Sequence, residues 1–215
     1  MGSGEVTRYL GTYGSARVER GVLVSPLQPF LLQTADNPDG VPRSVFDGFV
    51  QNAKADTPAW MKAFLDVSFG TGTGRDASVS DEALQANWNL AVSASATAAA
   101  ACIPTWGTDF RGDLAKIDVP ILIVQGDADQ ALPIDKTGKR VPALLKEAEL
   151  VVIKGGSHAI PWTHAAQVNS ALLQFIHAAA PTPMGWRSAR PCNPEPPCSA
   201  GQGGSVVVIP SKGDR

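Results

Sequence analysis

Residues 119–129 read Val-Pro-Ile-Leu-Ile-Val-Gln-Gly-Asp-Ala-Asp, an apolar run that ends in a glycine and two acids. A short apolar run bounded by turn residues predicts a strand that is buried on both faces of a sheet. A similar run occurs earlier at Val18–Ser25 and another later at Leu150–Lys154. Strands of this kind are typical of a parallel sheet covered by helices.

Helical patterns alternate with these three strands. The segment Gly2–Tyr13 carries apolar and aromatic residues at helical spacing and is followed by Gly14, a residue type that commonly ends helices. Two further helices are predicted at about Asp135–Lys146 and Thr163–His177. The alternation predicts an α/β fold class with a parallel sheet.

The segment of about residues 27–118, between the first two strands, is much longer than a single covering helix requires. Helix-length apolar spacing recurs within it four times, at Val45–Ala53, Pro58–Phe69, Ser80–Asn87 and Leu90–Ile103. We therefore expect an inserted helical cap over one end of the sheet, where it would help to form a substrate pocket.

The last part of the chain has a different composition. Residues 178–215 contain seven prolines and five glycines, a density at which a packed core is not expected. We predict a domain at residues 1–177 and a disordered tail at 178–215. Within that tail, the run Val206–Ile209 is the one stretch that could add to a sheet as an edge strand.

Composition excludes several classes of function. The 18 basic and 20 acidic residues give a net charge of −2 without a long run of either sign, which argues against nucleic-acid and membrane-surface partners. No stretch reaches the roughly 18 apolar residues of a spanning helix, and the first twenty residues are too charged for a signal peptide. We therefore expect a cytoplasmic protein.

The three cysteines fit neither a disulfide framework nor a metal site, and Cys102, in an Ala-rich run, is expected to be buried.

Chemically useful side chains follow two of the predicted strands, in Gly126–Gln130 and in Gly155–His158. The carboxyl ends of parallel strands share one edge of the sheet, so an aspartate and a histidine placed there can meet. Together they would form the acid and the base of a nucleophile-base-acid triad. Taken singly, Asp127 and Asp129 also fit the start of a turn, and His158 also fits the cap of the last helix.

The stretches Asp109–Asp135, Gly155–His158 and Trp162–Asn169 closely resemble the cofactor-free bacterial haloperoxidases. These are α/β-hydrolases, also called non-haem chloroperoxidases or perhydrolases, and the resemblance covers about residues 1–177. It implies an enzyme that acts on a small ester or peracid without metal or other cofactor. The family's motifs assign the acid to Asp129 and the base to His158. Trp162, which begins the helix after the catalytic loop, is our candidate for the substrate pocket.

Residues 1–9 match the part of the family's motif that follows its serine nucleophile. Met1 therefore corresponds to the residue whose backbone N–H contributes to the oxyanion hole, and the serine itself has no counterpart. Ser3 lacks the preceding strand that a nucleophile elbow needs, while Ser25 and Ser157 fit loop positions better.

We therefore expect the chain to be inactive alone and to expose a sheet edge through which it could associate or form homo-oligomers. The alternative is a non-catalytic remnant, or a protein that binds a small apolar ligand under the cap.

Overall fold

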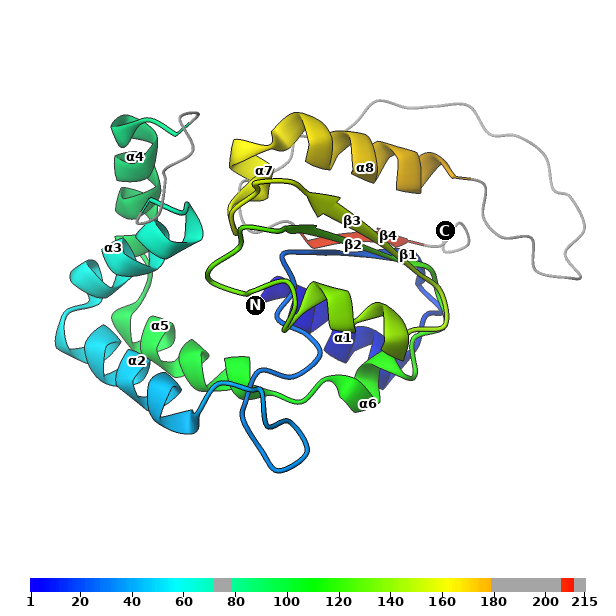
Figure 1. The fold of residues 1–215 in the computed structure, drawn as a ribbon, viewed down its shortest axis with the longest axis horizontal. Helices are drawn as coiled ribbons and strands as arrows, with labels where there is room; N and C mark the ends of the chain where they lie inside the picture. Colours follow the sequence, from blue (N-terminus) through cyan, green and yellow to red (C-terminus); the bar gives the residue numbers. More distant parts are fainter. Residues whose placement is uncertain (72–78, 179–205, 211–215) are drawn as a thin grey trace, which may run out of the picture.

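The computed structural model describes residues 1–71, 79–178 and, as backbone, 206–210. Strands β1 (Val18–Val24), β2 (Ile121–Gly126) and β3 (Ala148–Ile153) form a parallel sheet. Strand β4 (Val206–Pro210) pairs antiparallel with β1, so the strand order is β3-β2-β1-β4. Helix α1 (Gly2–Tyr13) covers one face of the sheet and α8 (Ala165–His177) covers the other (Figure 1). The sequence predicted these two helices and the three parallel strands, with boundaries that differ by a few residues.

Both faces of the sheet are packed with apolar side chains because successive residues of a strand point to opposite faces. On β2, Ile121 and Ile123 join the cluster that contains Val6 and Leu10 of α1. The side chains between and after them, Leu122 and Val124, join the cluster under α8. All four of these β2 side chains are fully buried, so the sheet is rigidly held where the loops with polar side chains begin.

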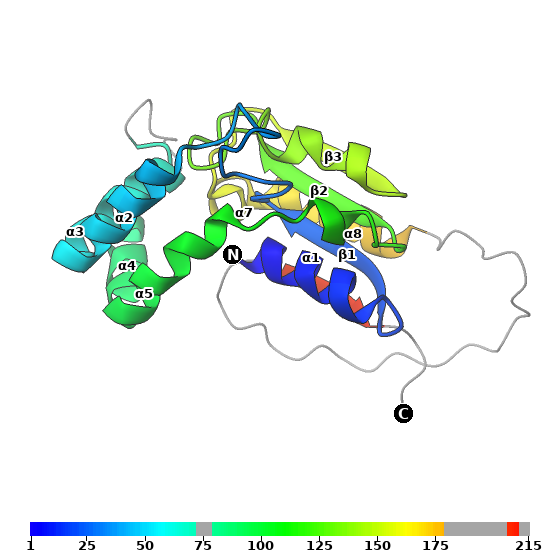
Figure 2. The same cartoon turned by 90° about the horizontal axis from the view of Figure 1, so that it is seen from below.

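The long connection between β1 and β2 is helical, as predicted. It comprises α2 (Arg43–Ala55), α3 (Thr57–Ser68), α4 (Asp81–Val92), α5 (Ala96–Cys102), the 3₁₀ turn η1 (Ile103–Gly107) and α6 (Arg111–Leu114). Helices α2 to α5 form a group beyond the carboxyl ends of the strands, whereas α6 returns to pack beside α1 (Figures 1 and 2). The interior of the cap includes a chain of aromatic contacts that links Phe49 with Trp60, Phe64 and Trp106.

Three sequence predictions about local structure are corrected. The predicted helix at 135–146 is replaced by two 3₁₀ turns, η2 (Gly138–Arg140) and η3 (Pro142–Leu144), because Pro142 lacks an N–H and the N–H of Gly138 bonds to a side chain instead. Helix α4 continues to Val92, beyond the predicted break at Asn87, and α5 starts only at Ala96. Cys102 is exposed rather than buried.

The prediction that all of 178–215 lies outside the fold is also corrected. Residues 206–210 form β4, in register with β1 through pairs such as Val208 with Gly21. The β-branched run Val206–Ile209 suits a strand, and it pairs with the edge of β1 that we expected to be unpaired. The remaining tail residues, 179–205 and 211–215, lie outside the described residues.

Among the described residues, no single helix is long and apolar enough to cross a membrane. The bent pair formed by 81–92 and 96–107, whose two parts meet at 95°, passes that test by length and composition only.

Candidate active site

Asp129 and His158 meet at the carboxyl ends of β2 and β3. The Nδ1 atom of His158 lies 2.9 Å from Oδ2 of Asp129, and the acid side chain is fully buried whereas the imidazole is 26% exposed. An ionised carboxylate can only accept, so Nδ1 is the donor in this pair and Nε2 is left free to take a proton. The other oxygen of Asp129 accepts a 2.8 Å hydrogen bond from the Leu132 N–H, which fixes the plane of the carboxylate.

Asp127, two residues before Asp129, hydrogen-bonds to the backbone of the neighbouring loop. Its Oδ1 accepts a 2.6 Å hydrogen bond from the N–H of Gly155, which has a φ of 73° in the turn that follows β3. The Ala128 N–H also donates to the carbonyl of Gly156, at 3.0 Å. These contacts join the loop after β2 to the loop after β3. The residue types alone did not separate the two acids, whereas the family resemblance assigned Asp129. The structure places Asp129 against the histidine and Asp127 against the Gly155 N–H.

Ser25, at the end of β1, contacts the same loop. Its hydroxyl donates to the carbonyl of His158 at 3.0 Å, and its N–H donates to the carbonyl of Val124 at 2.8 Å. Ser25 has a φ of 45°, which is uncommon for a residue other than glycine and is often found near functional sites. All three parallel strands therefore contribute to the position of His158.

The other two serines considered from the sequence, Ser3 and Ser157, have hydrogen bonds with partners other than the imidazole. Ser3 is buried in the first turn of α1, where its carbonyl accepts from Thr7, and the hydroxyl of Ser157 accepts from the Ala159 N–H. In the described ranges, no serine or cysteine side chain hydrogen-bonds to the His158 ring.

Met1 directly precedes α1, whose beginning lies at the cap-facing end of the sheet (Figures 1 and 2). Its carbonyl accepts from the N–H groups of Gly4 and Glu5, and its Sδ accepts from the Thr105 hydroxyl of η1. Burial lowers the pKa of the Met1 amino group below its ordinary value. The role of Met1 in an oxyanion hole remains a prediction.

Trp162 lies on the short helix α7 (Ile160–Thr163), and 51% of its surface is exposed. It lies close in sequence to His158, but its place in a substrate pocket also remains a prediction.

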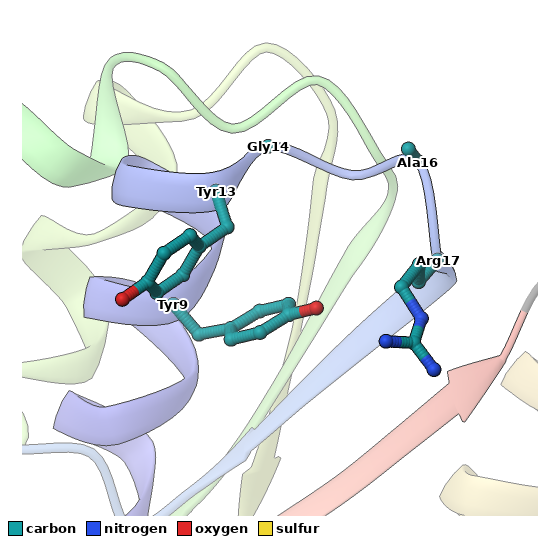
Figure 3. Close-up of a pocket in the computed structure, with 5 residues that line it drawn as sticks. All are labelled: Tyr9, Tyr13, Gly14, Ala16 and Arg17. Atoms are coloured by element: carbon teal, nitrogen blue, oxygen red, sulfur yellow. The ribbon is translucent and has the colours of Figure 1, made fainter.

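Two shallow hollows flank α1 and are separate from the Asp129–His158 pair. One, of about 360 Å³, is lined by Tyr9, Tyr13 and Arg17 with the neighbouring Gly14 and Ala16 (Figure 3). The other, of about 460 Å³, runs from Met1 past Arg8 to Phe110. Neither lining includes Asp129, His158 or Trp162, and of the predicted site residues only Met1 lines the second hollow. Within the described residues, no group of three or more His, Cys, Asp or Glu side chains could hold a metal ion.

Sequence reasoning missed Gln125, the residue that ends the apolar part of β2. It is fully buried and hydrogen-bonds to Leu132, Thr137 and Gly138 in the loop that carries Asp129. A polar side chain at the end of an otherwise apolar strand could have indicated this role from the sequence.

Comparison with known proteins identifies relatives that match most of this chain. A Synechocystis sp. protein whose name places it among the non-heme chloroperoxidases is 52% identical over 176 residues, which cover 82% of this chain and 64% of that protein. A bifunctional esterase/perhydrolase of Acinetobacter calcoaceticus is 34% identical, with the same two coverages. The crystal structure of bromoperoxidase from Bacillus anthracis superimposes with a TM-score of 0.78 at 35% identity, again over 82% and 64%.

The chain thus spans slightly less than two thirds of the length of these relatives. The family model of the alpha/beta hydrolase fold matches residues 1–165, a range that includes the cap and both loops of the Asp129–His158 pair. Because this match extends over more than half of the chain, the chain belongs to the α/β-hydrolase family.

Proposed function

We propose that Asp129 and His158 are the acid and base of a serine-hydrolase site that transfers acyl groups from small esters and peracids. The 2.9 Å contact between the buried carboxylate and the partly exposed imidazole carries this proposal. It matches the geometry in which an acid fixes the tautomer of a general base. Names of relatives that include haloperoxidase, esterase and perhydrolase support the same chemistry.

In the proposed reaction, Nε2 of His158 takes the proton of a hydroxyl nucleophile as its oxygen attacks the ester carbonyl. The proton then passes to the departing alcohol, which leaves an acyl-enzyme. Water releases the acid, whereas hydrogen peroxide releases a peracid. That peracid can oxidise a halide to hypohalous acid while it returns to the carboxylic acid, so the halide needs no binding residue and the protein needs no metal, haem or other cofactor.

We place the oxyanion of the tetrahedral intermediate at the start of α1, with Met1 as the residue that the family motif assigns there. A helix N-terminus presents unpaired N–H groups and favours negative charge. Trp162, exposed on α7 beyond His158, is proposed as a wall of the acyl pocket.

The hydroxyl nucleophile is not one that the described residues bring to His158, since Ser25 and Ser157 use their hydroxyls in loop contacts. We therefore propose that the 215-residue chain alone hydrolyses p-nitrophenyl acetate no faster than its His158→Ala variant. Saturable turnover by the chain alone that disappears in Ser3→Ala would identify Ser3 as the nucleophile and refute this part of the proposal.

The acid-base assignment is tested in a fusion that joins the residues of the Synechocystis relative that precede its matched region to the start of this chain. We expect esterase activity that withstands a metal chelator and is lost in His158→Ala, by a factor of about 10³ or more. An active fusion whose turnover survives His158→Ala would refute the proposed base.

A further inference from the structure

Gln125 is a fully buried glutamine at the point where β2 gives way to the loop that carries Asp129. Its Oε1 accepts a 3.0 Å hydrogen bond from the N–H of Gly138, and its Nε2 donates to the carbonyl of Leu132 at 2.7 Å. A backbone N–H can only donate and a backbone carbonyl can only accept. These two partners therefore fix which end of the carboxamide is oxygen and which is nitrogen.

The Gln125 carboxamide links two distant points of the loop that follows β2. Leu132 and Gly138 lie seven and thirteen residues beyond Gln125 in the sequence, yet one side chain bonds to the backbone of both. Thr137, also fully buried, adds a contact between its hydroxyl and the Gln125 Nε2 at 3.0 Å. The path of the loop thus depends on a side chain of the rigid sheet.

Asp129 receives its position from the same arrangement. The Leu132 N–H binds Oδ1 of Asp129, while the Leu132 carbonyl binds Gln125. In addition, Nε2 of Gln125 lies 3.3 Å from Oδ2 of Asp129, the oxygen that faces His158. Because Nε2 has two hydrogens and Leu132 takes one, the second faces Thr137 and Asp129 together.

We propose that Gln125 is the positioning residue of the acid, and that its carboxamide holds the loop of residues 129–138 so that the Asp129 carboxylate stays directed at Nδ1 of His158. Gln125 would thus hold the acid of the proposed acid-base pair in place. Its importance for catalysis rests on the proposed function. It predicts that disturbing the carboxamide weakens the Asp129–His158 contact even though neither residue is changed.

Two substitutions disturb the carboxamide in different ways. Gln125→Met keeps a side chain of similar length and removes all its hydrogen bonds. Gly138→Ala leaves Gln125 in place, but its new Cβ would lie 2.1 Å from Oε1 of Gln125, so the carboxamide must move. Val124→Ala is the matched control, because Val124 is the neighbouring buried β2 residue and packs towards α8 rather than towards the loop.

The readout is the tautomer of His158, measured by ¹⁵N NMR of the histidine-labelled chain at a pH where the imidazole is neutral. The chain has three histidines, so His158→Gln identifies the signal. We expect the unchanged chain to hold the Nδ1–H form, and the ratio of the Nδ1–H to the Nε2–H form to fall about tenfold in Gln125→Met and Gly138→Ala. Val124→Ala should keep the original ratio.

An unchanged ratio of the two His158 tautomers in folded Gly138→Ala would overturn the inference. This holds even if Gln125→Met does not fold. A fall of equal size in Val124→Ala would overturn it as well, because general destabilisation would then explain the effect. The measurement needs no turnover: if the fusion were inactive while the tautomer responded as expected, the proposed function would fail and the positioning role would stand.

Discussion

Gly126 and Gly156 approach each other so closely that a Cβ on Gly126 would lie 1.9 Å from the carbonyl oxygen of Gly156. The first residue ends β2 and the second lies in the loop that carries His158. The two loops can meet at this distance only because neither residue has a side chain. The pair therefore sets the spacing of the backbone from which Asp129 and His158 extend.

Gly126→Ala should separate the two loops, because the clash is with backbone and cannot be relieved by rotating a side chain. We expect a loss of about 1–3 kcal/mol in the free energy of unfolding, measured by urea denaturation. Gly48→Ala is the control, since Gly48 lies within α2 with open space around it, and there alanine should stabilise by about 0.5–1 kcal/mol. Equal stability of Gly126→Ala and the parent chain would contradict this account of the loop spacing.

Arg20 of β1 anchors the end of α8. It is buried, its guanidinium donates to the carbonyls of Phe175 and Ala178, and it lies 5.4 Å from the centre of the Phe175 ring. Arg20→Met should cost about 1–3 kcal/mol of unfolding free energy because it removes the donors to the buried Phe175 carbonyl and to the Ala178 carbonyl at a helix C-terminus.

Arg20→Lys should recover part of that loss, since it keeps a positive charge but lacks the two-pronged donor. Replacing the exposed Arg17 by methionine should change the unfolding free energy by less than about 0.5 kcal/mol. Similar unfolding curves for Arg17→Met and Arg20→Met would show that the anchor is not needed.

Strand β4 covers the edge of β1, and that edge should become available to other chains when β4 cannot pair. Val208 pairs with Gly21 in the middle of β4. Proline at position 208 lacks an N–H and disrupts a strand, so Val208→Pro should raise the share of associated chains in light scattering after gel filtration. Val208→Thr keeps the N–H and a β-branched side chain and should behave as the parent. Unchanged association in Val208→Pro would show that β4 does not protect this edge.

The parts of the fold that could be predicted from the sequence are those with a local signal. The helix Gly2–Tyr13 has helical spacing and a following glycine, and β2 is apolar from Ile121 to Val124, so both were identified. The order Asp then His after successive strands also predicted that an aspartate would meet His158, because parallel strands end at one edge. The choice of Asp129, which contacts His158 in the structure, came from the family resemblance.

The parts that could not be predicted depend on contacts between distant residues. The pairing of β4 with β1 joins residues far apart in the chain, and a four-residue run carries little local information. The helical spacing in 135–146 was overridden by the bond of Gly138 to Gln125, a partner thirteen residues away. The conformation of Ser25, with its φ of 45°, accompanies contacts with Val124 of β2 and with His158 in the loop after β3, both far from Ser25 in the sequence.

The most direct test of the central claim compares Asp129→Asn with Asp127→Asn in the active fusion, by kcat/KM for p-nitrophenyl acetate. Asparagine at 129 can no longer enforce the Nδ1–H tautomer of His158, so we expect a loss of about 10⁴-fold. Asparagine at 127 can still accept from the Gly155 N–H, so that variant should lose less than about tenfold. Equal losses in the two variants, or a larger loss in Asp127→Asn, would contradict the assignment of Asp129 as the acid partner of His158.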